Sequence, residues 1–216
     1  MFVPMGLTTL TTPAVAADPV NSTDSTAVTT HPFNLPTPVG GIKAGQLLLA
    51  FSFTGAGSTV TGPAGWTVLN ADPNLLVMYK VAVGGETGPV SFTTAAAKFH
   101  KTVCELLTGV ATSGFIEKTA EDHGSSGYAD APAISPSWGT SAGSMIYTPS
   151  IMINNAVFTA APIGYDPVGT LSLDVGNLTA GSVCRRNTTI VTEDPPSQTA
   201  SYGGSWHSLT VAVKGS

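Results

Sequence analysis

The stretch Gln46-Leu47-Leu48-Leu49-Ala50-Phe51-Ser52-Phe53 decides the fold class. Alternate positions of an extended chain point to opposite sides, so one side of this stretch carries large apolar residues and the other side carries smaller ones. The large set is Leu47, Leu49, Phe51 and Phe53, and the opposite set is Leu48, Ala50 and Ser52. This pattern predicts a β-strand that lines the core of a sandwich.

Short apolar or alternating runs recur along the chain, and Gly and Pro residues separate many of them. A short strand is expected from Trp66, and the other runs are 75–83, 89–94, 102–107, 144–148, 151–159, 170–175, 188–192 and 208–213. The segment 98–110 is long enough for a helix, but its Thr and Val residues and the stop at Gly109 favour a strand. The sequence therefore predicts an all-β fold, an antiparallel, jelly-roll-like β-sandwich over residues 31–216.

The composition is unusually poor in charge. Charged residues make up 10% of the 216 residues, against roughly 25% in ordinary soluble domains. Hydroxyl and small apolar groups cost less free energy to remove from water than ammonium and carboxylate groups do. Such a surface suits a subunit that stays packed against neighbouring proteins. It suits a secreted β-domain rich in Ser and Thr equally well, so composition leaves both interpretations open.

Residues 1–30 are rich in Thr, Ala, Pro, Ser and Val and show no helical period. The stretch up to Ala17 ends in small residues, as a secretory cleavage site does. However, it has no Lys or Arg, and Thr and Pro interrupt its apolar run, which disfavours a signal peptide. We expect an extended N-terminal arm over residues 1–30 that lies on another subunit. A floppy linker is the alternative.

Charge and cysteine usage restrict the partners. The net charge is −5 and the basic residues are scattered, so we expect no nucleic-acid partner. The longest apolar runs are too short to span a bilayer, so we expect no membrane partner. Cys104 and Cys184 could form one disulfide, but a fold that depends on disulfides usually has more than two cysteines. Two buried thiols are therefore the favoured interpretation.

The sequence carries no recognised catalytic motif. It has no Gly-rich phosphate loop, no Gly-x-Ser-x-Gly motif and no Cys/His set with metal-binding spacing. We therefore predict no catalytic, cofactor-binding or metal-binding residues and no cofactor. Glu121-Asp122-His123 is the nearest to a cation site, but adjacent side chains alternate in direction and the Gly and Ser residues that follow favour a solvated turn. We interpret His100 and His207 as structural histidines, since a triad is recognised by its geometry.

The three tryptophans can be core anchors or ligand contacts. An exposed indole on a β-sandwich can stack on a sugar ring, whereas a buried one packs in the core and donates its N–H to a partner. Trp66 is predicted to be a core residue. Trp138 and Trp206 follow Ser residues near turns and are the candidates for contact with a ligand or partner protein.

The region 31–110 resembles a domain of tailed-bacteriophage virion proteins. The resemblance rests on the order of four segments, Ile42-Lys43-Ala44-Gly45-Gln46-Leu47-Leu48-Leu49-Ala50-Phe51, Pro63-Ala64-Gly65-Trp66-Thr67-Val68-Leu69, Tyr79-Lys80-Val81-Ala82 and Val90-Ser91-Phe92-Thr93-Thr94. The closing segment 201–213 is similar to the end of such domains, and the match is weaker over 111–200. Gln46 departs from the pattern, because an acidic residue is usual there.

This resemblance implies a structural or adhesive role without catalysis. The implied function is a capsid decoration or cement protein, or another head-surface subunit, that binds the major capsid protein or a tail protein of the same virion. A homo-oligomer, with a trimer as the specific expectation, and location in a virion assembled in the bacterial host cytoplasm would follow. The alternative is a tail appendage or a receptor- or carbohydrate-binding module that contacts a host surface glycan. A polysaccharide-degrading enzyme is disfavoured, because few paired carboxylates are available.

Overall fold

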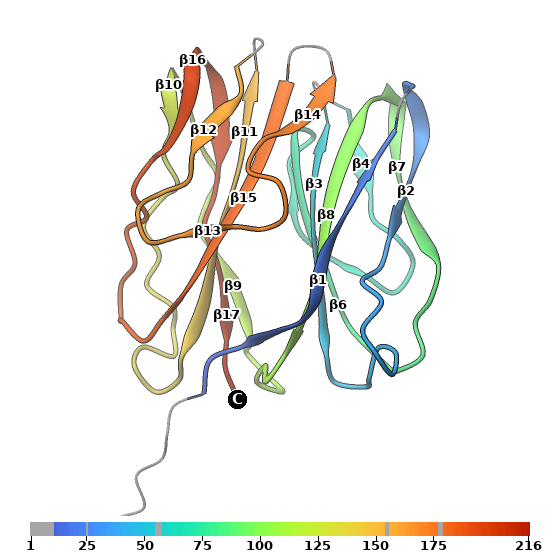
Figure 1. Cartoon of the computed structure of the whole chain (residues 1–216), viewed down its shortest axis with the longest axis vertical. Coiled ribbons are helices and arrows are strands. Elements are labelled where there is room, and N and C mark those ends of the chain that lie inside the picture. Colours follow the sequence, from blue (N-terminus) through green and yellow to red (C-terminus); the bar gives the residue numbers. More distant parts are fainter. Residues whose placement is uncertain (1–10, 25, 55–57, 154–155, 177–178) are drawn as a thin grey trace, which may run out of the picture.

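The computed structural model describes residues 11–24, 26–54, 58–153, 156–176 and 179–216, and every regular element in these ranges is a β-strand (Figure 1). The strands form antiparallel sheets in three layers, which we call the small, central and large sheets. The central sheet has the order β1-β8-β3-β6-β5, with β1 (Ala14–Thr23), β3 (Leu47–Thr54), β5 (Thr67–Ala71), β6 (Leu75–Val81) and β8 (His100–Thr108).

The two outer sheets cover opposite faces of the central sheet. The small sheet has the order β2-β7-β4, with β2 (Val28–Asn34), β4 (Val60–Thr61) and β7 (Pro89–Lys98). The large sheet has the order β10-β16-β11-β15-β13, and its strands are β9 (Ile116–Lys118), β10 (Asp122–Ala129), β11 (Ser144–Ile153), β12 (Phe158–Ala160), β13 (Asp166–Pro167), β14 (Leu173–Gly176), β15 (Thr179–Thr188), β16 (Gln198–Ser208) and β17 (Val211–Lys214). Packed antiparallel sheets confirm the predicted all-β sandwich, and the jelly-roll-like winding stays a prediction.

Strand β3 is buried on both of its faces, as its nearly continuous apolar sequence requires. Its large side chains face the large sheet and share one core with it, and Phe51 lies 5.2 Å from Tyr147 between ring centroids. Its other face packs against the small sheet in a second core with Phe33 and Phe92. The predicted strand is therefore confirmed, and it separates two cores instead of lining one. Full burial of such side chains contributes roughly 1.5–3 kcal/mol each.

A buried ion pair crosses the core between the central and large sheets. Glu105 on β8 is fully buried, and its carboxylate pairs with the Arg185 guanidinium on β15. The Tyr147 hydroxyl on β11 donates to the same carboxylate. Burial raises the pKa of Tyr147 well above its usual value, so this hydroxyl keeps its proton and remains a donor. Apolar packing and this charge pair thus join the two halves of the chain.

The chain passes from the central sheet into the small sheet at one corner. Strand β1 pairs with β8 in the central sheet, and β2 pairs with β7 in the small sheet. The connections between β1 and β2 and between β7 and β8 therefore bend together, as strands do when they switch between sheets. The Asp24 N–H donates to the His100 carbonyl at 3.2 Å and joins the two bends.

The second half of the expected N-terminal arm is part of the sandwich. Residues 14–23 are the edge strand β1 of the central sheet, and β2 begins at Val28 in the small sheet. The reason is that the backbone of this segment pairs with β8 of the same chain. Residues 1–10 of the expected arm lie outside the described residues.

Other expectations have mixed outcomes. The ambiguous segment 98–110 contains the strand β8, as favoured, and Cys104 and Cys184 are buried free thiols, as favoured. The strand expected at 188–192 is wrong, because the strand there is β15, which ends at Thr188. The small, polar and charged residues of β15, Gly181, Ser182, Arg185 and Arg186 among them, concealed a strand that is mostly buried.

Candidate functional site

The two tryptophans expected to contact a ligand are both buried. Trp138 is 8% exposed and donates its indole N–H to the Ser144 hydroxyl at 2.8 Å. Trp206 is 6% exposed and donates to the Ser126 hydroxyl at 3.0 Å. Gly124 lies opposite Trp206 on β10, and a Cβ there would be 2.7 Å from the indole. The exposed role of Trp138 and Trp206 is therefore corrected, because each satisfied indole fills a pocket in the large sheet.

Trp66 is a half-buried residue at the small sheet. Its ring meets Phe33 edge-on at 5.4 Å between centroids and packs against the core of the small sheet. This agrees with the core role that the sequence predicted.

The sequence Glu121-Asp122-His123 is not a solvated turn. Asp122 begins strand β10, and the Glu121 carboxylate accepts from His207 Nδ1 on β16 at 2.6 Å. Asp72, from the turn between β5 and β6, lies 3.9 Å from the same nitrogen. The three donor atoms lie within 4.8 Å of one another, and we call this set the open cluster. Sequence reasoning missed it because Asp72 is far from the other two residues along the chain.

His207 binds its proton more strongly in the open cluster than a histidine does in water. The hydrogen bond to Glu121 raises the pKa of His207, and the negative charges of Asp72 and Glu121 act in the same direction against partial burial. The side chains of His207, Asp72 and Glu121 are 23%, 25% and 16% exposed. Solvent and small solutes therefore reach this cluster.

A second carboxylate–histidine set lies at the corner between the central and small sheets. Asp24 Oδ2 is 2.7 Å from His31 Nδ1 and 2.5 Å from His100 Nδ1. Both rings are fully buried, and we call this set the sealed cluster. Desolvation lowers the pKa of His100 to about 4 against the attraction of Asp24. His100 is therefore neutral near pH 7, and the prediction of a structural histidine fits its position.

The sealed cluster includes an Asp–His–Thr line with the spacing of a catalytic triad. His31 Nε2 is 2.7 Å from the Thr94 hydroxyl, which donates its only proton to the Ala96 carbonyl at 2.8 Å. On its other side, His31 Nδ1 faces the Asp24 carboxylate and completes the line. Thr94 is 5% exposed, so no substrate reaches its hydroxyl. These hydrogen bonds hold the corner between the central and small sheets. The Thr94 hydroxyl lacks the access to a substrate that nucleophilic catalysis needs.

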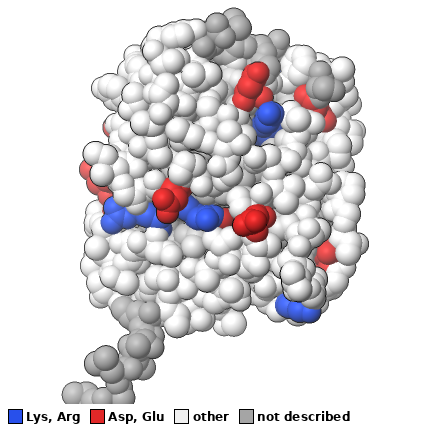
Figure 2. All heavy atoms as spheres, viewed as in Figure 1, with Lys and Arg blue, Asp and Glu red and all other residues white. Residues whose placement is uncertain are grey.

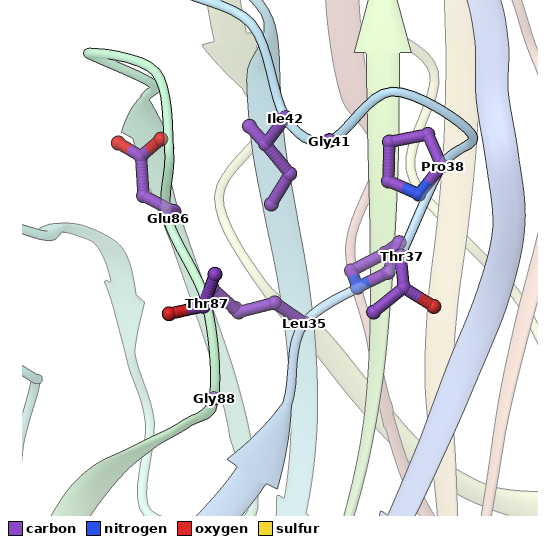
Figure 3. A pocket seen from close by; sticks show the side chains of 9 residues that line it. Leu35, Thr37, Pro38, Gly41, Ile42, Glu86, Thr87 and Gly88 are labelled. Atoms are coloured by element: carbon purple, nitrogen blue, oxygen red, sulfur yellow. The ribbon is translucent and has the colours of Figure 1, made fainter.

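An apolar recess lies between the loop from β2 to β3 and the loop from β6 to β7. Figure 3 shows its lining side chains, with Leu35 and Ile42 on one loop opposite Glu86 and Thr87 on the other. Its volume is about 120 Å³, which is room for a small apolar side chain. The neighbouring loop residues Val39 and Val83 are fully and 78% exposed. We call these two loops with their recess the loop end.

Hydrogen bonds from both loops fix the shape of the recess. Gly85 N–H donates to the Ile42 carbonyl at 3.0 Å, and the Glu86 carboxylate accepts from the N–H groups of Val83 and Gly84. Lys80 adds an ion pair at 3.3 Å. Burial favours the neutral acid, but these bonds outweigh it and lower the pKa of Glu86. Gly84 and Gly85 have positive φ angles, which only glycine adopts at low cost.

Comparison with known proteins gives no relative: no family model, curated protein or solved structure matches this chain. In the described ranges, no helix is long and apolar enough to cross a membrane.

Proposed function

We propose that the chain is a non-enzymatic structural protein of a tailed-phage virion, a capsid decoration or cement protein or another head-surface subunit. In this role it binds neighbouring capsid proteins. The observation that carries the proposal is the loop end, where two exposed valines, Val39 and Val83, lie on the loops that form a preformed apolar recess. The resemblance of residues 31–110 to virion proteins supplies the class of partner.

The surface supports a protein partner. Charge on the face shown in Figure 2 is limited to a short mixed band at the height of β13 and β15 and a few isolated groups. A neutral surface requires little desolvation of charge when it is covered. Exposed apolar side chains next to a rigid recess resemble the centre of an interface, where a few anchors supply most of the binding energy.

The loop end lies at the same end of the molecule as the C-terminus (Figure 1). The partner proposed for it is the major capsid protein or a tail protein of the same virion. A homo-oligomer, with three copies around the attachment point, would repeat the loop end on one side of the assembly and add the binding energies of the copies. The virion assembled in the bacterial cytoplasm is the proposed location.

The test is a sedimentation assay with particles that lack the protein. Purified chain is mixed with them, the particles are pelleted and the bound copies are counted. Hundreds of copies per particle support a capsid decoration protein, and about a dozen support a vertex or tail position. Val39→Asp and Val83→Asp should each weaken binding by about tenfold or more. Ile163→Asp is the matched control, because Ile163 is 86% exposed on a different loop.

Two results would remove the proposal. The first is an absence of binding by the unchanged chain. The second is equal loss of binding in the Ile163→Asp control, which would show that any charge on the surface has the same effect.

A tail appendage or a receptor- or carbohydrate-binding module is the second candidate. Tyr128 on β10 and Tyr202 on β16 are 52% and 50% exposed, and they are the exposed aromatic side chains among the described residues. Aromatic rings at the surface of a sheet can stack on sugars. Binding on a glycan array that disappears in Tyr128→Ala and Tyr202→Ala would favour this candidate over the first.

A further inference from the structure

The open cluster brings together ligand types that transition metals prefer. Asp72, Glu121 and His207 come from a turn and two segments of the large sheet, and their donor atoms lie within 4.8 Å of one another. One imidazole and two carboxylates are borderline-hard donors of the kind that Zn²⁺ accepts. The prediction of no metal-binding residue was based on spacing along the chain, and these residues meet only in the fold.

A second imidazole stands beside this set. His123 on β10 is directly opposite His207 on β16, and opposite residues of an antiparallel pair share one face of the sheet. The two rings are 6.0 Å apart between centroids. Rotation of the exposed His123 side chain can therefore bring a nitrogen toward the cluster. Two imidazoles and two carboxylates complete a four-coordinate set.

Neighbouring groups hold the carboxylates in place. The Asn70 amide donates to Glu121 Oε2 at 2.9 Å and to the Leu75 carbonyl at 2.7 Å. The Asn74 N–H donates to Asp72 Oδ1 at 2.7 Å. Such bonds to ligand side chains usually change metal affinity by about 10–100-fold. The carboxylates are therefore positioned before any ion arrives.

The turn that carries Asp72 also contains an unexplained buried oxygen. Asn74 is 9% exposed, and its Oδ1 has no hydrogen-bond partner among the described residues. A buried carbonyl oxygen without a donor is rare and requires an explanation, of which a nearby water or ion is one. Asn74 lies two positions from Asp72 along the chain.

The sealed cluster has the same residue types and does not fit an ion. Asp24, His31 and His100 also bring three donor atoms within 4.8 Å. Both rings are fully buried, and the second nitrogen of His31 is taken by Thr94. An ion would have no entry path there and would have to break the hydrogen bonds that join the two sheets.

We propose that Asp72, Glu121 and His207, with His123 as the fourth ligand, bind a divalent transition-metal ion of the Zn²⁺ class. The ion replaces the proton between His207 Nδ1 and Glu121 Oε1, and that proton passes to solvent. Two ligand atoms that each lie about 2.0–2.2 Å from a tetrahedral ion are roughly 3.4 Å apart, so the present 2.6 Å contact has to open by roughly 0.8 Å. The bound ion links the β5–β6 turn of the central sheet to the large sheet. This role is independent of binding at the loop end.

The test is calorimetric titration of the full chain with ZnCl₂ after treatment with a chelator and buffer exchange. We expect one ion per chain and a higher unfolding temperature with Zn²⁺, because an ion that binds only the folded state stabilises it. Glu121→Gln and His207→Ala should each weaken Zn²⁺ binding by at least about tenfold, and His123→Ala should weaken it also. Asp18→Asn is the matched control, because Asp18 is an exposed carboxylate on β1.

The conservative variant Glu121→Gln separates loss of a metal ligand from loss of the fold. Glu121→Gln preserves shape and hydrogen bonding, and its circular dichroism should match that of the unchanged chain. Visible absorption of Co²⁺ in place of Zn²⁺ reports nitrogen and oxygen ligands directly and should change in the His207→Ala variant. Equal Zn²⁺ affinity of the unchanged chain and His207→Ala would overturn the proposal. So would binding of Ca²⁺ as tightly as Zn²⁺, since imidazole ligands disfavour Ca²⁺.

Discussion

Strand β3 contributes side chains to both faces of the central sheet. A different carboxylate–histidine cluster lies on each side of that sheet. On one face, Phe51 and its alternate neighbours pack against the large sheet, and the open cluster lies where the β5–β6 turn meets the edge of that sheet. On the other face, Leu48 and Ala50 pack against the small sheet, and the sealed cluster pins the corner. Both clusters use histidine and carboxylate, yet only one of them is accessible to solvent.

The difference shows that environment decides what the same residue types do. At His100, desolvation dominates and lowers the pKa to about 4. At His207, the hydrogen bond to Glu121 dominates and raises the pKa. Burial therefore has the larger effect in the sealed cluster, whereas hydrogen bonding to a carboxylate has the larger effect in the open cluster.

The largest expected effect concerns the charge pair between the central and large sheets. Glu105→Ala leaves the Arg185 guanidinium partly buried without its partner and removes the acceptor of the Tyr147 hydroxyl. Loss of one partner of a buried ion pair costs about 3–5 kcal/mol. Urea unfolding followed by tryptophan fluorescence measures this loss.

Asp18→Asn is the control for that variant, because it removes a carboxylate from an exposed position on β1. Its expected change is within about 0.5 kcal/mol. A change of less than about 1 kcal/mol for Glu105→Ala would show that the pair contributes no more than a surface ion pair.

The next effect in size is acid sensitivity at the sealed cluster. The folded-state pKa of His100 is about 4, below the unfolded value of 6.5. The unfolded chain therefore binds more protons between these values, and stability falls as the pH drops from about 6.5 to 4. The expected loss at this group is about 3 kcal/mol.

His100→Asn isolates this contribution, because the amide can donate to Asp24 and does not titrate. The difference in unfolding free energy between pH 7 and pH 4 should be about 3 kcal/mol smaller in the variant than in the unchanged chain. Identical pH profiles would mean that His100 is not the group that carries the effect.

The smallest effect tests how closely the large sheet approaches the central one. A Cβ at Gly181 on β15 would lie 2.4 Å from the Phe53 ring, whereas a Cβ at Gly127 on β10 meets nothing closer than 4.0 Å. Gly181→Ala should cost about 1–3 kcal/mol through overpacking, and Gly127→Ala should be close to neutral. Thermal unfolding of the two variants compares them, and equal melting temperatures would contradict the close approach.

Part of the fold could be predicted because its signals are local. The alternation in 46–53 and the turns rich in Gly and Pro indicate strands, and two cysteines in a chain with a large core indicate free thiols. Strand β15 was missed because Arg185 interrupts its apolar pattern, and its buried partner Glu105 is 80 positions away in sequence, from 105 to 185. Pairing across such distances leaves no trace in local composition.

The sequence by itself determined that this protein is an all-β sandwich with little surface charge. Tertiary structure alone decided which histidine meets which carboxylate, since Asp24 and His100 are 76 positions apart and Glu121 and His207 are 86 positions apart. It also decided that Trp138 and Trp206 are buried. The physical reason is that strand periodicity is set by neighbouring residues, whereas burial and proton affinity are set by whichever sheets fold over a side chain.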